Sequence, residues 1–379
     1  MPLIANDDMC ISPVSIKNPN YGADPRKGVN YLKDCTNAII QVPCGHCYEC
    51  IHARQQEKIQ RFAMEYMVSD FFFCTLTYNN DMLPSVTVKD RVIHYPDYRD
   101  LRCFIKRLEK FDTFGEPFKY FAVSEYGSTK HRPHFHVIFA LPKLIGHDSE
   151  VQNISRQNAL YSKVLKEWRR NVSSTRSPDY KPLCTYAYNR RTNKSNFDFH
   201  YVNQHSTIFS GDALNNVSFY VSKYLLKYSE YEKKLLSWLH FNLSDAEELK
   251  RVRHLVTTRS YMSKSFGVCT TDKQIAHIRR GIDTAIQEGF KYPLFINPNT
   301  GATFPLCRYY KQKHFTYIDA TTMHYNDCDN QQLDSHVDSF DTIYQANSER
   351  KIEIDKIKRF KKNIHYLNEK FNEKNEDFL

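Results

Sequence analysis

Two histidines separated by one residue, His134 and His136, form the first pair of side chains with clear chemical potential. The segment around them has the composition of a β-strand, in which alternate side chains share a face. Both imidazoles therefore project to one side, whereas Phe135 and Val137 project into a core. Glu125 lies on the preceding predicted strand, across a turn, and can add a carboxylate oxygen. Two imidazoles and a carboxylate with open positions suit Mg²⁺, Mn²⁺ or Zn²⁺ in a catalytic role, and a hydrogen-bonded histidine pair without a metal is the alternative.

A run of three cysteines, Cys44-x2-Cys47-x2-Cys50, follows a proline near the N-terminus. Thiolates at this spacing can converge on one Zn²⁺, and a structural zinc takes four ligands in a tetrahedron. We favour Cys10 as the fourth ligand, because it lies on a loop-like arm that a metal could tie down. The sequence leaves three other possibilities open. The thiols can be free in a loop, the fourth ligand can be Cys35 or His46, or the cysteines can hold an iron–sulfur cluster, although no further ferredoxin-like spacing supports the last.

Two tyrosines and two lysines lie at helical spacing in the second half of the chain. Tyr220 and Tyr224 are one turn apart on a predicted helix, and Lys223 and Lys227 form a row beside them. Two phenols and two ammonium groups can converge on a phosphate, and a tyrosine beside a cation can act as a covalent nucleophile. The alternative is an amphipathic helix whose tyrosines cap a hydrophobic core.

The composition limits the classes of protein to which this chain can belong. The chain has 379 residues, a formal charge of +10 and 14% aromatic residues. This charge favours a polyanionic partner, and aromatic rings beside cations suit single-stranded nucleic acid. The N-terminal residues lack the pattern of a secretory signal, and no apolar stretch is long enough for a membrane span. We therefore expect a soluble intracellular protein with no membrane partner.

The elements that must position these residues are readable from hydrophobic periodicity. The pattern predicts a strand at 71–78, with strands at 118–125 and 132–141 joined by a turn. It predicts helices at 51–67, 97–111, 159–171 and 216–238, an irregular stretch at 172–215 with a strand near 197–201, and a tail helix at 352–371. The tail helix either docks on its own domain or mediates dimerisation.

Taken together and in this order, the motifs resemble the HUH endonuclease superfamily of rolling-circle replication initiators, relaxases and some transposases. The similarity is greatest to the replication initiator proteins of microviruses, the small single-stranded DNA bacteriophages, and it covers about residues 9–315. The segments that carry it are Met9-Cys10-x2-Pro13, Pro43–Cys50, Phe73–Tyr78, Glu125-Tyr126-Gly127, Arg132–His136, Tyr220–Tyr224, Met262–Gly267 and Arg308–Lys311.

The resemblance implies an α+β fold with a central antiparallel sheet flanked by helices, an RRM-like palm, and an N-terminal Cys-rich zinc-binding arm. We expect three parts: the Cys-rich arm and first helix at 1–68, a nicking domain at 69–240 with a polar insert at about 145–210, and a C-terminal extension at 241–379.

The resemblance also implies a reaction. Glu125, His134 and His136 would hold Mg²⁺ or Mn²⁺, and Tyr220 or Tyr224 would attack the scissile phosphate with help from Lys223. The products would be a 5′-phosphotyrosine and a 3′-hydroxyl that primes rolling-circle replication, with later rejoining of the ends. The implied partners are single-stranded or supercoiled origin DNA and the host helicase and polymerase in the bacterial cytoplasm. As DNA contacts we expect Lys130 and Arg132, beside the metal site, and Lys227, in the lysine row of the predicted helix.

Two other classes remain open on the sequence. A non-catalytic, zinc-dependent DNA-binding regulator would explain the charge and the cysteines, but not the order of His-x-His and Tyr-x3-Tyr. A transposase or relaxase would use the same chemistry, but the paired tyrosines and the cysteine arm favour the replication initiator.

Overall fold

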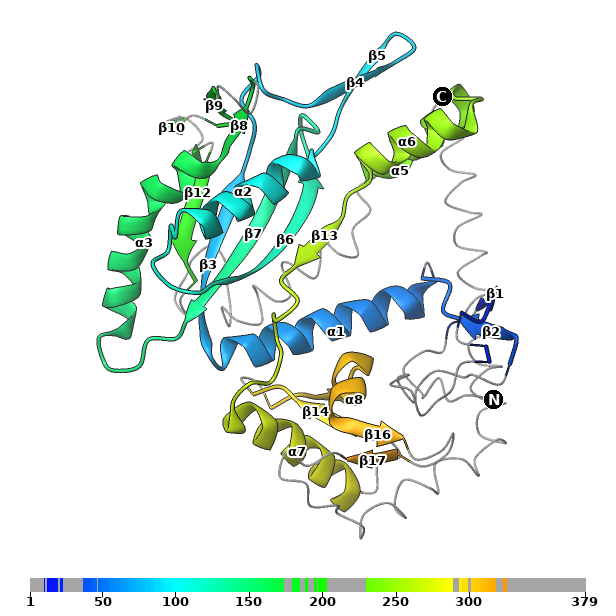
Figure 1. Cartoon of the computed structure of the whole chain (residues 1–379), viewed down its shortest axis with the longest axis vertical. Coiled ribbons are helices and arrows are strands. Elements are labelled where there is room, and N and C mark those ends of the chain that lie inside the picture. The colour runs from blue at the N-terminus through cyan, green and yellow to red at the C-terminus, as the bar shows by residue number, and fades with distance from the viewer. Residues whose placement is uncertain are drawn as a thin grey trace.

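The structure is a computed structural model. It describes residues 10–325 except 11, 20, 23–36, 46, 174–178, 185–187, 190–193, 196, 203–229, 289–292, 299–300 and 318–322. Figure 1 shows these residues as coloured elements around a central sheet.

The central element is a five-stranded antiparallel sheet in the spatial order β12-β3-β7-β6-β13. Its strands are β3 (Ser69–Leu76), β6 (Lys119–Tyr126), β7 (Pro133–Pro142), β12 (Phe197–Tyr201) and β13 (Ser260–Met262). The predicted mixed fold with a central antiparallel sheet is therefore confirmed, as are the strands predicted near 71–78, 118–125, 132–141 and 197–201.

Four of these strands follow one another with two helices in the order β3, α2 (Tyr98–Lys110), β6, β7, α3 (Ser149–Glu167) and β12. This is a β-α-β-β-α-β order. The first strand of the unit, β3, lies inside the sheet, and the last strand, β12, lies at one edge. β13 comes from beyond residue 240, the boundary predicted from the sequence, and completes the opposite edge.

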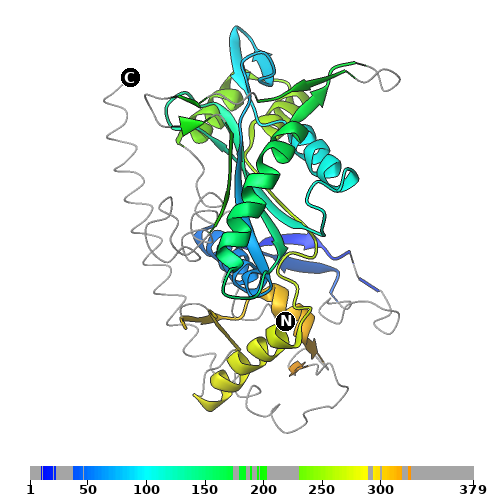
Figure 2. The same cartoon turned by 90° about the vertical axis from the view of Figure 1, so that its left-hand side faces the viewer.

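Helices cover both faces of the sheet (Figures 1 and 2). On one face, α2 and α3 pack on a core that includes Phe72, Phe135 and Phe139. On the other face, α1 (Tyr48–Tyr66) places Phe62 against Phe71 and other sheet residues. Because successive strand residues face opposite sides and both sides are buried, β3 is apolar along most of its length.

Helix α1 also joins the sheet to the C-terminal elements. Its opposite side packs on a cluster from α7 (Asp272–Gln287), β14 (Leu294–Ile296) and α8 (Arg308–His314). Glu65 is fully buried and accepts hydrogen bonds from Lys119 Nζ and from the Gly267 N–H. Gly267 has φ +70°, and a Cβ there would meet the Arg61 backbone, so this turn requires glycine.

Local sequence explains where α2, which the sequence predicted, and α6 (Ala246–Val256), which it did not, begin. Asp97 caps α2 by accepting a hydrogen bond from the Arg99 N–H, and Asp245 caps α6 through the Glu247 N–H.

The remaining elements among the described residues are one helix and six two-stranded sheets. The helix is α5 (Glu230–Asn242). The strand pairs are β1 (Val14–Lys17) with β2 (Ile39–Val42), β4 (Ser85–Val88) with β5 (Arg91–His94), β8 (Arg169–Asn171) with β9 (Tyr180–Pro182), β10 (Tyr188–Asn189) with β11 (Lys194–Ser195), β14 with β15 (Thr303–Pro305), and β16 (Phe315–Tyr317) with β17 (Met323–Tyr325).

Two sequence predictions in the middle of the chain need correction. The helix predicted at 159–171 instead begins at Ser149 and ends at Glu167, and the last predicted helical residues form β8. Within the stretch 172–215, predicted to be irregular, the described residues also form β9, β10 and β11. The prediction missed the start of α3 because most of its residues are polar and only a few, including Leu160 and Val164, are buried.

Among the described helices, none combines the length and apolar character needed to cross a bilayer. Residues 216–229 of the predicted helix at 216–238 and the whole tail helix at 352–371 lie outside the described residues.

Candidate functional site

Glu125, His134 and His136 converge at one end of the central sheet. β6 and β7 pair so that Glu125 lies directly opposite His134, and His136 is two residues further along on the same face. His136 Nε2 lies 3.1 Å from Glu125 Oε2 and 3.1 Å from His134 Nε2, and His134 Nε2 lies 3.5 Å from Glu125 Oε2. The neighbouring Phe135 and Val137 point into the opposite core, as predicted.

The outer nitrogens of both rings are held by fixed partners. His134 Nδ1 lies 3.2 Å from the Arg132 carbonyl oxygen, which can only accept a hydrogen bond. The proton of a neutral His134 therefore sits on Nδ1, and Nε2 keeps its lone pair toward the cluster. His136 Nδ1 lies 3.2 Å from the hydroxyl of Thr75, which can accept in the same way. Such outer partners orient the ring of a metal-ligating histidine.

The charges of the cluster also favour a cation. Burial alone would raise the pKa of Glu125, but hydrogen bonds and charge interactions with His134 and His136 lower it to about 2. Burial lowers the pKa of His136, against the opposing effect of Glu125. An ionised carboxylate and a neutral imidazole are the forms that bind a metal ion.

The ligand-to-ligand distances fit a metal ion. Three ligands at about 2.1 Å from one ion lie roughly 3.0 Å apart in an octahedron and about 3.4 Å apart in a tetrahedron. Two of the observed separations, both 3.1 Å, fall in this range, and the third, 3.5 Å, lies close to its tetrahedral limit. With both histidines neutral and protonated on Nδ1, three electron-pair donors face one another, an arrangement that a cation stabilises.

A second cluster lies near the N-terminus, where Cys10, Cys44, Cys47 and Cys50 bring their sulfur atoms within 4.8 Å of one another. Cys47 Sγ and Cys10 Sγ are 3.8 Å apart, which equals the edge of a tetrahedron with Zn–S bonds of about 2.3 Å. The backbone N–H of Cys44 points at Cys10 Sγ at 3.1 Å. The structure therefore brings Cys10 to the predicted cluster, while the alternatives Cys35 and His46 lie outside the described residues.

This cysteine cluster is built onto the start of α1. Cys47 occupies the N-cap position without a side-chain cap bond, and Cys50 lies in the first turn. Gly45 has φ +75°, a left-handed conformation that glycine adopts readily, and its carbonyl oxygen accepts a hydrogen bond from Arg54. Burial and hydrogen bonding with Cys47 raise the pKa of the Cys50 thiol, so a bound cation would be needed to hold it as a thiolate.

The structure describes only some of the other predicted site residues. Tyr220, Lys223, Tyr224 and Lys227 all lie outside the described residues. Lys130 is exposed on the turn between β6 and β7.

Arg132, the other predicted DNA contact, has its guanidinium engaged within the protein. It donates hydrogen bonds to the Asn80 side chain and to the Tyr78 carbonyl oxygen. These bonds tie the β6–β7 turn to the loop that follows β3, so Arg132 positions the end of the sheet on which the histidines stand.

The sequence analysis missed the role of Thr75 and the packing of His131. Thr75 pairs with His136 across β3 and β7, a register between residues 61 positions apart that no local pattern reveals. His131 has φ +48° and stacks on Tyr231 of α5 with ring centroids 4.1 Å apart. A positive φ is unfavourable for a residue other than glycine, so it indicates that contacts with another element stabilise the turn. Here that element is α5, through Tyr231.

Comparison with known proteins places this site in a family. A family model of the replication-associated protein ORF2/G2P matches residues 71–265, just over half of the chain, and this segment includes Glu125, His134 and His136. The chain belongs to the replication-associated protein ORF2/G2P family. The matched residues include the last strand of the sheet in sequence, β13, and the first, β3, from Phe71 onward.

Two relatives come from microviruses. The replication-associated protein ORF4 of Chlamydia phage 1 is 33% identical over 100 residues, which cover 26% of this chain and 23% of that protein. The replication-associated protein VP4 of Bdellovibrio phage phiMH2K is 32% identical over 108 residues, which cover 27% of this chain and 32% of that protein. The chain thus spans about a quarter to a third of the length of these curated relatives. The resemblance to microvirus replication proteins is confirmed.

One solved structure is also similar, the N-terminal nuclease domain of minute virus of mice non-structural protein-1. The match has a TM-score of 0.16 and 12% identity, and covers 30% of this chain and 60% of that one. A likeness this slight carries no argument about the site.

Proposed function

We propose that this protein is a replication-initiation endonuclease that nicks single-stranded or origin DNA through a covalent tyrosine intermediate and later rejoins the ends. The observation that carries the proposal is the convergence of Glu125, His134 and His136 on the central sheet. These residues lie inside the segment that matches the replication-associated family. The β-α-β-β-α-β order of the sheet supports the further proposal that it is an RRM-like palm.

The three side chains form an open site for a catalytic metal. A bound Mg²⁺ or Mn²⁺ would supply positive charge that offsets the charge on a phosphate and polarises it. Glu125 contributes its ionised carboxylate, while the Arg132 carbonyl and the Thr75 hydroxyl hold the two histidine rings in the ligating orientation. Three protein ligands leave further positions for phosphate oxygens, as catalytic metal sites require.

In the proposed reaction, the phenolate oxygen of Tyr220 or Tyr224 forms a bond to phosphorus in line with the bond to the 3′ oxygen. That bond breaks, and the departing 3′ oxygen takes up a proton to become a hydroxyl. The phenol first loses its proton to solvent, and the ammonium of Lys223 stabilises the phenolate. These roles rest on the resemblance. The phosphotyrosine is itself a phosphodiester, so a later 3′-hydroxyl can attack its phosphorus, rejoin the strand and release the tyrosine phenol.

The remaining roles follow from this one. We propose that the four cysteines hold one structural Zn²⁺ that fixes the N-terminal arm to α1, and that the chain divides at about residues 68 and 240. Exposed Lys130 lies on the turn next to the metal site, where it can meet a DNA phosphate, and Arg132 and Lys227 are the other proposed DNA contacts. The 3′-hydroxyl would serve a host polymerase, with a host helicase as a further partner.

The test is formation of an SDS-resistant protein–DNA adduct. The protein is incubated with labelled single-stranded origin-containing phage DNA and Mg²⁺ or Mn²⁺, and the adduct is resolved on a denaturing gel. Tyr220→Phe and Tyr224→Phe should each weaken the adduct, and the double variant should abolish it. Tyr21→Phe, a change of an exposed tyrosine in the N-terminal arm, is the matched control. An undiminished adduct in the double variant would overturn the assignment of the nucleophile.

A further inference from the structure

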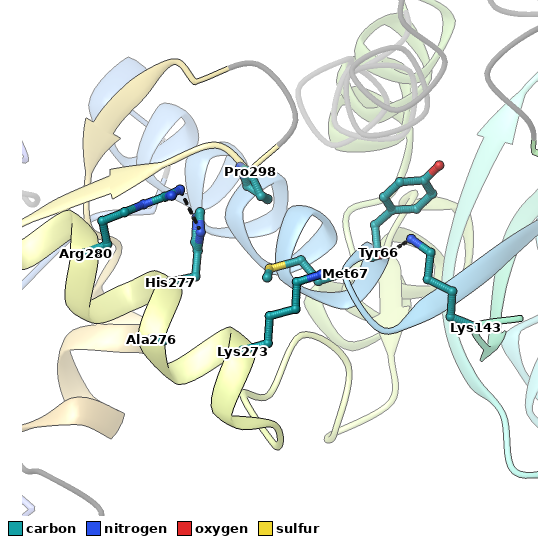
Figure 3. A pocket seen from close by; sticks show the side chains of 8 residues that line it. All are labelled: Tyr66, Met67, Lys143, Lys273, Ala276, His277, Arg280 and Pro298. Carbon is teal, nitrogen blue, oxygen red and sulfur yellow. Dashed lines mark hydrogen bonds between the residues drawn. The ribbon is translucent and has the colours of Figure 1, made fainter. Parts of the chain in front are cut away.

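A cationic pocket lies far from both cysteine and histidine clusters, where the end of α1 meets α7. It has a volume of about 460 Å³, and the side chains around it come from α1, the residue after β7, α7 and the turn after β14 (Figure 3). Its charged members are Lys143, Lys273 and Arg280. No carboxylate is among the described residues that line it.

The α7 sequence presents these groups on one side of the helix. Lys273, His277 and Arg280 are spaced by four and three residues, so they share a face, and Figure 3 shows them along the same wall. His277 Nε2 donates to the Ile296 carbonyl oxygen, which leaves Nδ1 as an acceptor. Arg280 lies 3.3 Å from that nitrogen and donates to it, so the guanidinium is held at the pocket.

Lys143 closes the opposite wall. Its ammonium group donates to the Tyr66 carbonyl oxygen at 2.9 Å and lies 4.3 Å from the centre of the Tyr66 ring. Asp70 attracts this lysine, but its carboxylate is buried and accepts hydrogen bonds from the Leu144 N–H and Asn153. Asn153 belongs to α3, on the other face of the sheet, so Asp70 does not neutralise the pocket from within.

We propose that this pocket binds backbone phosphate of a single DNA strand, as a second anchoring site separate from the metal cluster. Several cations around one hollow without a lining carboxylate repel one another, and a phosphodiester relieves that repulsion. Lys143 directly follows β7 and lies nine positions after His134, so the two sites lie about 30 Å apart along the strand direction. One strand can therefore touch both sites only if it is long enough to follow the protein surface between them. The inference rests on the proposed function only in taking DNA as the polyanion.

The experiment compares binding of fluorescent oligothymidylate by the full chain at several salt concentrations. One oligothymidylate is long enough to reach between the two sites, and the other is too short. The pocket variant is Lys273→Glu with Arg280→Glu. The control, Arg102→Glu with Lys106→Glu, makes the same charge change on exposed residues of α2, which covers the opposite face of the sheet.

We expect the pocket variant to bind the long strand roughly tenfold more weakly, and the slope of log K against log salt to lose about 0.7 for each phosphate contact removed. The α2 control should lose less in both respects. Equal losses in the two variants, or an unchanged slope in the pocket variant, would overturn the proposal. Thermal melting checks the fold, and Lys273→Ala, which removes one exposed side chain, should give about half the change in slope if the double variant unfolds.

Adduct formation separates this proposal from the proposed function. If the wild-type protein forms no adduct but the pocket variant still loses salt-dependent binding, the nicking function fails and the phosphate site stands. If the wild-type protein forms the adduct and the pocket variant binds the long strand as the α2 control does, the phosphate site alone fails.

Discussion

The two clusters of side chains that could hold a metal ion differ in the ligand positions that they leave open. The cysteine cluster gathers four sulfur atoms, and the protein itself can complete a tetrahedron around an ion. The Glu125–His134–His136 cluster gathers three ligand atoms at the end of a sheet, so positions around an ion remain for a substrate.

Their supports differ as well. The cysteines stand on loop residues and on the first turn of α1, and all but Cys50 are only partly buried. The histidines and Glu125 stand on paired strands with a buried core behind them. An ion in the cysteine cluster would therefore fix the N-terminal arm to α1. In the histidine cluster the sheet already fixes the three ligands, with or without an ion.

Removal of a cysteine ligand should have the largest effect on folding. Cys47→Ser leaves three thiols, and structural zinc in small sites contributes about 10–16 kcal/mol of apparent binding free energy. We expect loss of the bound zinc and a fall of several kcal/mol in stability, measured by metal analysis and thermal melting. Cys103→Ser, at an exposed cysteine on α2, is the control. Full zinc content in Cys47→Ser would remove Cys47 from the cluster.

Removal of a histidine ligand should instead leave folding nearly intact and stop the chemistry. His134 is only partly buried, and its Nε2 faces the cluster rather than the core. We expect His134→Ala to lower the rate of adduct formation by at least about 100-fold, with a melting temperature close to that of the wild type. The control is His147→Ala, at an exposed histidine in the β7–α3 connection. Adduct formation at the wild-type rate would contradict the metal site.

A smaller effect should come from the residue that orients His136. Thr75→Val keeps the shape of the side chain but removes the hydroxyl that meets His136 Nδ1. Loss of an outer partner of this kind costs roughly 10- to 100-fold in metal affinity or activity. We expect the Mn²⁺ concentration needed for half-maximal adduct formation to rise by such a factor, and Thr75→Ser to restore it. If Thr75→Val and Thr75→Ser behave alike, Thr75 does not position the ring.

The sequence predicted the features that depend on local pattern. The alternation around Phe135 and Val137 placed both histidines on one face, and the predicted turn before Arg132 placed Glu125 on the adjacent strand. The exact pairing of Glu125 with His134 comes from the structure. It did not reveal Thr75, because the pairing of β3 with β7 joins segments far apart in the chain. It also missed the start of α3, where exposed and polar residues outnumber the few buried ones. The cationic pocket needs α1, β7 and α7 brought together, which only the tertiary fold does.

The central claim is that one cluster holds a structural ion and the other an exchangeable catalytic one, and chelation tests it most directly. The protein is treated briefly with EDTA, and bound zinc and adduct formation are measured before treatment, after it, and after addition of Mg²⁺ or Mn²⁺. We predict that zinc stays at one equivalent per chain while adduct formation is lost and then restored by the added ion. Adduct formation that survives EDTA, or that returns only when zinc is supplied, would contradict the account.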